Sequence, residues 1–343
     1  MDDLTNRAYA LRRDIIEEVY RSGAGHVGGD LSVIDILTVL YFGVMNVSPE
    51  NWTSPDRDRF FLSKGHSVDA LYMVLGEKGF FDKQEAIETF SAQGSRFIGH
   101  PNTEVPGIEM NSGSLGHGLA LGVGTALAAK MDGRGYRTYV VLGDGEMAEG
   151  SNYEAMMAAG HYHLDNLCAT VDLNRLQISG KTEDVMCSDS LARKFRAFGW
   201  HVTEAEDGND CGQLLAAYQT AAAFRGKPTA IIAHTVKGKG VSFMEDQAGW
   251  HHGVMKPEQY AQAVAELEER AQMLTEAQKA AGQQAAAGAQ KNAERQIPAE
   301  EKTTDTEVVN PGAEAYTNVP GKTAAGSRES AADNRKVEAS HGK

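Results

Sequence analysis

The feature that most constrains the fold is a pair of apolar segments that both end in oxygen-bearing residues. The first is TYVVLGDGEMAEG, residues 138–150, and the second is NLCATVDLNRLQISG, residues 166–180. Each opens with a β-branched, apolar run that is typical of a buried strand, and residues 148–163 between them have helical composition. Strand, helix and strand of this length predict a βαβ unit, whose parallel strands bind ligands at their carboxyl ends.

The ends of these two strands predict a cation site. Asp144 follows the first strand, and Asn174 and the backbone carbonyls after it follow the second. Such oxygens are hard ligands that suit Mg²⁺ or Ca²⁺, and Mg²⁺ takes its remaining ligands from water and phosphates. Gly143 and Gly145 keep Cβ atoms away from a phosphate. The spacing alone leaves a plain turn equally open, because GDG is a common turn sequence.

Composition narrows the class of protein. The 343 residues suffice for one large α/β domain or two ordinary ones, and 41% hydrophobic with 23% charged residues is a soluble globular composition. A formal net charge of −14 argues against nucleic-acid binding. The charged N-terminal segment predicts neither a signal peptide nor a membrane span. Cys168, Cys187 and Cys211 lack metal-ligand spacing, which favours a reducing cytoplasm.

The remaining segments alternate between helix and strand and predict a doubly wound, largely parallel α/β sheet. An amphipathic helix over residues 4–19 ends at Gly23 and Gly25, and Asp30 or Ser32 is placed to cap the apolar helix that follows. Further helices are expected to open at Ser67 and near Ser114, with others over residues 190–198 and 210–224. Strands are expected from residues 59, 200 and 228.

The C-terminal part changes in composition. Residues 256–279 have a helical pattern in which Tyr260, Val264, Leu267 and Met273 face inward. Further on, Ala, Gln, Thr, Ser, Gly and charged residues replace aliphatic ones. We therefore expect an α/β domain over residues 1–270 and a low-complexity tail over 271–343, disordered or weakly helical in its last sixty or so residues.

Four histidines fall in separate loops at the expected ligand edge: His26, His66, His100 and His251. Each alone is more often an ordinary surface residue. Together, beside a cation site, they favour a site that handles sugar hydroxyls and moves protons near neutral pH. The glycine-rich loop over residues 237–253 follows the last strand, so we expect it to cover this site.

The motifs resemble those of the transketolase family from about residue 4 to residue 260. The matching segments are AGHVGGDLS, LSKGH, IGHP, SGSLGHG, GDGEMAEG, VDLNR, TVKGKG and GWHHG. GDG followed about thirty residues later by Asn174 is similar to the thiamine diphosphate fingerprint. The resemblance implies the thiamine diphosphate-binding fold, Mg²⁺ held by Asp144, Asn174 and the carbonyl of Leu176, and Gly145 beside the diphosphate.

The resemblance also implies roles for other residues. His26 and His251 would contact the sugar and shuttle protons, and His100 would contact the hydroxyls of the donor's two-carbon end. His66 would lie against the cofactor, and Lys237 and His251 would approach its diphosphate. The cofactor's backbone contacts would come from Gly113, Ser114 and Leu115, and Glu149 matches a glutamate at the subunit contact.

Three positions depart from the family pattern. Gly29 stands where many full-length enzymes have a serine, His117 replaces a frequent glutamine, and His252 is an additional histidine. The last departure leaves open whether His251 or His252 is the site histidine.

The largest departure is the lack of a second domain resembling the family's pyrimidine-binding domain. That domain supplies the glutamate that contacts the aminopyrimidine, so we expect a split transketolase acting on sugar phosphates, in which a separate C-terminal subunit brings this glutamate and the assembly is a dimer or heterotetramer. Two alternatives stay open. One is another thiamine diphosphate enzyme, such as deoxyxylulose-phosphate synthase or the α chain of a 2-oxo acid dehydrogenase, and the other is a non-catalytic cofactor-binding module.

Overall fold

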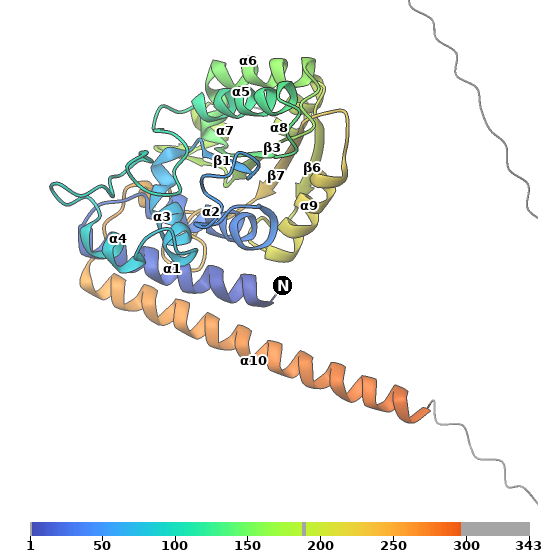
Figure 1. Cartoon of the computed structure of the whole chain (residues 1–343). Coiled ribbons are helices and arrows are strands. Elements are labelled where there is room, and N and C mark those ends of the chain that lie inside the picture. The colour runs from blue at the N-terminus through green and yellow to red at the C-terminus, as the bar shows by residue number, and fades with distance from the viewer. Residues whose placement is uncertain (1, 187–189, 296–343) are drawn as a thin grey trace, which may run out of the picture. The chain divides into compact units, whose positions relative to one another are not determined.

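A computed structural model describes residues 2–186 and 190–295 of the chain (Figure 1). Met1–Gln290 form one compact unit, and of the second unit, Lys291–Lys343, only the helical residues 291–295 are described. The last helix, α10 (Pro257–Arg295), continues across the predicted boundary at residue 270. The rest of the predicted tail, like Cys187, lies outside the described residues.

Five parallel strands form the central sheet, as the sequence predicted. Their order is β1 (Arg59–Leu62), β2 (Thr138–Gly143), β3 (Leu167–Leu173), β7 (Thr229–His234) and β6 (His201–Ala205). Gly143 on β2 pairs with Asp172 on β3, which pairs with Ala233 on β7. The carboxyl ends of these three strands therefore meet at one edge. A short antiparallel ribbon, β4 (Leu176–Gln177) with β5 (Gly180–Lys181), follows β3.

Helices cover both faces of the sheet (Figure 1). One hydrophobic core lies between the sheet and α1 (Asp2–Ser22), α2 (Val27–Val39), α3 (Val68–Glu77), α4 (Lys83–Thr89) and α9 (Cys211–Ala223). The other lies under α5 (His117–Met131), α6 (Gly150–His161) and α8 (Leu191–Ala197). Neighbouring strand residues alternate between the two cores: Val140 belongs to the second and Val141 to the first. The sheet is thus doubly wound.

Helix α2 is the central helix of the first core. It continues into the π-helical turn η1 (Leu40–Val44), and Val27–Val44 is long and apolar enough to cross a membrane but is 83% buried within the protein. Such burial is typical of a core helix. The prediction that Asp30 or Ser32 caps this helix is wrong, because the helix begins at Val27 and both side chains are buried within it. They instead bind the Ala70 amide and the Asp172 carboxylate.

Helix α10 packs on α1 through its first turns. Tyr260 stacks on Tyr20 with ring centroids 4.1 Å apart, and Leu267 is buried. Met273 was predicted to face inward but is 57% exposed, so that prediction is wrong. The contact between the helices has become polar at this distance along α10, where Asn6 and Gln278 are hydrogen-bonded at 2.8 Å.

Candidate functional site

The residues after β2 and β3 form the predicted oxygen cluster. The Asp144 carboxylate accepts hydrogen bonds from the backbone N–H groups of Gly145, at 2.8 Å, and of Arg175. Arg175 lies between Asn174 and Leu176, so the Asp144 carboxylate is next to the turn that carries both. Arg175 has a left-handed φ of 63°, and the Asn174 side-chain oxygen accepts the Leu176 N–H at 3.1 Å. The structure thus brings Asp144, Asn174 and Leu176 together.

The charge on this cluster fits a hard divalent cation. Burial, together with the neighbouring Asp172, raises the pKa of Asp144 to about 6. A bound cation would offset both effects, because it stabilises the ionised carboxylate. The donor set of carboxylate, amide and carbonyl oxygens suits Mg²⁺ or Ca²⁺ and does not suit Zn²⁺.

A cavity of about 570 Å³ adjoins this turn. It is lined by residues of the β3 and β7 ends and the following loops, including Asn174, Leu176, Thr182 and Thr235. Its volume is large enough to hold a diphosphate group. Gly145 borders Gln177: a Cβ at Gly145 would lie 2.4 Å from Gln177 Cγ, so the glycine is required for this packing.

A buried ion pair lies behind the cation site. Lys64 Nζ is 2.5 Å from Asp172 Oδ2, and the two side chains are 2% and 0% exposed. Asp172 also accepts hydrogen bonds from Ser32 and Thr235. Burial alone would raise the pKa of Asp172, but the Lys64 ammonium and these hydroxyl groups hold it below its usual value. The sequence pattern did not predict a role for Lys64, although its place in LSKGH, directly after a strand, was a signal for one.

Five histidine rings gather beside the oxygen cluster. His26 precedes α2, His66 lies in η2 (Gly65–Ser67), His100 lies in a loop, and His251 and His252 lie at the end of η4 (Ala248–His251). The His26 ring centroid is 5.2 Å from that of His66, 6.2 Å from His100, 5.6 Å from His251 and 4.3 Å from His252. All four histidines predicted for the site, with the additional His252, therefore lie in one cluster.

Four of these rings, those of His26, His66, His100 and His251, have lowered pKa values and are held as neutral imidazoles. Burial and the neighbouring histidines and lysines lower the pKa of His26 to about 4. Burial and Lys237 lower the pKa of His251 to about 3, and burial also lowers the pKa values of His66 and His100. His26 Nδ1 is buried without a hydrogen-bond partner among the described residues. Neutral rings with an unpaired nitrogen can accept or donate protons when a polar ligand enters.

The loop after β7 brings a lysine to the histidines. Lys237 Nζ lies 2.9 Å from His251 Nδ1, and burial with the nearby Lys64 lowers the pKa of Lys237 to about 8. The loop is tied to the start of α2, where the Gly238 N–H donates to the Gly28 carbonyl at 2.9 Å. A Cβ at Gly28 would lie 2.8 Å from the Trp250 carbonyl oxygen. The predicted covering loop is therefore packed directly against the loop that carries His26.

The segment before α5 connects the histidines to the oxygen cluster. Gly113 has a φ of 146°, and a Cβ there would lie 3.0 Å from the His100 ring. Ser114 is exposed and Leu115 is half-buried. The helix predicted to start near Ser114 begins at His117, because Gly116 adopts a left-handed conformation with φ of 86°.

Glu146, which sequence reasoning did not assign, holds this segment in place. Its buried carboxylate accepts the Gly116 N–H at 2.8 Å and the Gly143 N–H at 2.9 Å, and also binds the Ser63 hydroxyl. The signal was an acidic residue directly after GDG. Glu149, predicted to lie at a subunit contact, is exposed at the start of α6.

A group of buried acids lies behind His26. Glu18, Asp30 and Asp69 are each 0% exposed, and the Asp69 carboxylate accepts the His26 backbone N–H at 3.2 Å. Burial raises the pKa values of all three, that of Asp69 to about 7. The sequence pattern did not indicate this cluster, because its members lie on three separate segments.

The structure also explains one departure from the family pattern. A Cβ at Gly29 would lie 2.9 Å from Ser67 Oγ and 3.7 Å from Lys64 Nζ. Ser67 thus already places a hydroxyl group beside this position, and a larger residue at 29 would displace it. His117 is exposed on the first turn of α5.

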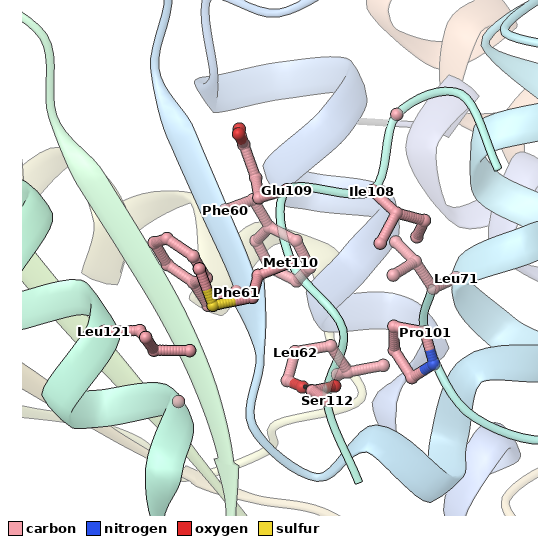
Figure 2. Close-up of a pocket in the computed structure, with 12 residues that line it drawn as sticks. Phe60, Phe61, Leu62, Leu71, Pro101, Ile108, Glu109, Met110, Ser112 and Leu121 are labelled. Atoms are coloured by element: carbon pink, nitrogen blue, oxygen red, sulfur yellow. Dashed lines mark hydrogen bonds between the residues drawn. The ribbon is translucent and has the colours of Figure 1, made fainter. Parts of the chain in front are cut away.

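A small cavity near the loop of residues 101–112 does not belong to this site. Figure 2 shows its mostly apolar lining, including Phe61, Leu71, Ile108 and Leu121. Its volume is only about 20 Å³, which is the space of a water molecule. It is too small to hold a cofactor.

This chain belongs to the transketolase family. Residues 4–315 match the family described as "Transketolase, thiamine diphosphate binding domain". The chain is 51% identical over 263 residues to one of the subunits of apulose-4-phosphate transketolase of Phocaeicola vulgatus, covering 77% of this chain and 93% of that protein. It is 42% identical over 267 residues to 6-deoxy-6-sulfo-D-fructose transketolase subunit SqwG of a Clostridium species, covering 78% and 96%.

Solved structures agree with these sequence matches. The transketolase of Campylobacter jejuni superposes with a TM-score of 0.74 at 30% identity, covering 79% of this chain and 43% of that chain. The transketolase of Leishmania mexicana has a TM-score of 0.69 at 29% identity, with 81% and 45% covered. This chain therefore spans less than half the length of those enzymes and nearly the whole length of the relatives that are named as subunits.

Proposed function

We propose that this chain transfers a two-carbon ketol unit only together with a separate chain. The proposal starts from the fact that this chain belongs to the transketolase family as an N-terminal, thiamine diphosphate-binding subunit. The observation that carries the proposal is the convergence of five histidines next to an oxygen cluster suited to a hard cation. In this proposal the partner supplies the pyrimidine-side glutamate and the far end of the sugar pocket.

The chain's own residues have the properties that the proposed cofactor requires. Asp144, Asn174 and the Leu176 carbonyl would hold Mg²⁺ or Ca²⁺, and the Lys237 ammonium would approach the diphosphate. His66 and the backbone of residues 113–115 would contact the rest of thiamine diphosphate. When bound, this cofactor supplies the carbanion-stabilising centre of the reaction.

The histidines would orient the sugar and handle its protons. The His26 ring is only partly buried, so it can accept a hydrogen bond from a sugar hydroxyl and then take its proton. His251, held by Lys237, would act beside it, and His100 would contact the hydroxyls of the two-carbon end. The packed loop of residues 237–251 would limit the access of water.

We further propose ketose and aldose phosphates as the substrates, with apulose 4-phosphate as the donor to assay first because of the 51% identical relative. Buried free thiols at Cys168 and Cys211 support a reducing, cytoplasmic location. The exposed Glu149 supports a subunit contact at α6, in a dimer or heterotetramer.

The test is ketol transfer by this chain alone and mixed with a chain that carries the pyrimidine-binding domain. Thiamine diphosphate, Mg²⁺ and ribose 5-phosphate are present throughout, and the donors are apulose 4-phosphate, 6-deoxy-6-sulfofructose and xylulose 5-phosphate. Activity only in the mixture is the expected result, and robust transfer by this chain alone would refute the split arrangement. Pyruvate decarboxylation would favour another thiamine diphosphate enzyme, and cofactor binding without turnover would favour a non-catalytic module.

A further inference from the structure

Three of the clustered histidines lie close enough together to share a metal ion. His26, His251 and His252 each offer one ring nitrogen, and these nitrogens all lie within 4.8 Å of one another. In a tetrahedral zinc site with Zn–N bonds of about 2.0–2.1 Å, neighbouring nitrogens are about 3.3 Å apart. Because His252 is exposed, rotation of its ring can close most of this difference.

The chemistry of these ligands selects the kind of cation. Imidazole nitrogens suit Zn²⁺, Ni²⁺ and Cu²⁺, whereas Mg²⁺ and Ca²⁺ prefer oxygen. Three histidines with an open fourth position are an established arrangement for Zn²⁺. We propose that His26, His251 and His252 bind one borderline divalent cation such as Zn²⁺, at a place separate from the oxygen cluster of Asp144 and Asn174.

One neighbour opposes the cation. Lys237 Nζ is 2.9 Å from His251 Nδ1, so this lysine repels a metal ion bound to the same ring. If the metal binds Nε2, the ring keeps its N–H on Nδ1, and the Lys237 ammonium has to rotate away. Zn²⁺ therefore binds more weakly here than at three histidines without a lysine, and Lys237→Met binds it more tightly.

The consequence for turnover rests on the proposed function. Two of these rings, His26 and His251, are proposed to contact the sugar, so a Zn²⁺ ion bound to them excludes the donor. Zn²⁺ at micromolar concentration then inhibits ketol transfer by the two-chain mixture, competitively with the donor and reversibly on addition of a chelator. Metal binding itself needs neither the partner nor turnover.

The test is titration of the full chain with Zn²⁺ alone in competition with a chromophoric chelator, and with Co²⁺ for its visible absorption. We expect one site per chain, at least tenfold weaker in His252→Asn and unchanged in His161→Asn, which removes an exposed histidine of α6. Excess Mg²⁺ should not compete, and Asp144→Asn should leave the site intact.

Several outcomes would overturn the proposal. They are equal affinity in His252→Asn and the parent, loss of the site in Asp144→Asn, or weaker binding by Lys237→Met. Tighter binding by Lys237→Met cannot result from damage to the fold, so this variant separates a true site from a structural effect. If Zn²⁺ binds as expected while the mixture lacks ketol transfer, the proposed function fails and the metal site stands.

Discussion

Two buried polar clusters lie behind the histidines and balance their charges in opposite ways. In the first, the Asp172 carboxylate has the Lys64 ammonium and two hydroxyl groups as partners. In the second, Glu18, Asp30 and Asp69 have no cation among their described hydrogen-bond partners. Neither carboxylate oxygen of Glu18 has a hydrogen-bond partner among the described residues. The first cluster holds its charge in an ion pair, whereas burial favours the protonated form of the acids in the second.

Removing the cation of the paired cluster should change the stability of the protein most. Lys64→Met should lower the free energy of unfolding by about 3–5 kcal/mol, because it leaves the Asp172 charge buried without its partner. Urea denaturation followed by circular dichroism measures this loss. Adding Asp172→Leu to the same chain should recover much of it, since no buried charge then remains. An equal loss in the double variant would show that Lys64 acts through packing alone.

Asp144 is intermediate between the ion-paired Asp172 and the acidic cluster. Its carboxylate has two N–H donors, and a bound cation would supply the missing charge. Thiamine diphosphate with Mg²⁺, at about one hundred times its dissociation constant, should stabilise the parent by about 2.7 kcal/mol. Asp144→Asn should lose this stabilisation in a thermal melt, whereas the exposed Asp132→Asn should keep it. If Asp144→Asn is stabilised as much as the parent, Asp144 does not hold the cation.

The Ser32 hydroxyl on α2 allows a single hydrogen bond to Asp172 to be tested. Ser32→Ala removes a 2.6 Å hydrogen bond to the ionised carboxylate and should cost about 1.5–3 kcal/mol. Thr38→Val is the matched control, because the buried Thr38 hydroxyl on the same helix has no described partner. Its free energy of unfolding should be unchanged or higher. Similar losses in both variants would contradict a special role for the Asp172 bond.

A change in the acidic cluster should alter the free energy of unfolding least, and by an amount that depends on pH. The pKa of Asp69 is raised to about 7, so this group stabilises the fold fully below its unfolded pKa of about 4 and loses that contribution as pH rises through 7. Asp69→Asn removes the buried charge and keeps an acceptor for the His26 N–H. It should exceed the parent in stability by on the order of 1–2 kcal/mol at pH 8, and by less at pH 5.5.

Thermal melts at the two pH values provide this comparison, again with Asp132→Asn as the surface control. A difference between Asp69→Asn and the parent that is the same at both pH values would mean that Asp69 does not titrate in this range.

The sequence predicted the sheet and its ligand edge because these depend on local patterns. Apolar runs at residues 138–143 and 167–173 form adjacent parallel strands, and Asp144 and Asn174 follow them as expected. The histidines were predicted because they lie in separate loops at the expected ligand edge and in motifs that resemble one family. Residues close together in the sequence were therefore enough to predict both the sheet edge and the histidines.

The clusters behind the site were not predictable in the same way. Lys64 and Asp172 are 108 residues apart in the chain, and only the packing of β3 against the loop after β1 pairs them. Asp30 was predicted to be a helix cap, because Asp favours that position, yet it is buried inside α2. Met273 was assigned to a buried stripe whose partner helix presents polar groups at that point. Tertiary contacts decided each of these positions.

The gathering of five rings on one polypeptide has a consequence for inheritance under the proposed function. The gene for this chain alone carries the proton-handling set, while the gene for the partner carries the rest of the sugar pocket. A mutation, duplication or replacement of the partner gene can then change which sugar is recognised while the histidines stay as they are. New substrate ranges can arise by exchanging one gene of the pair.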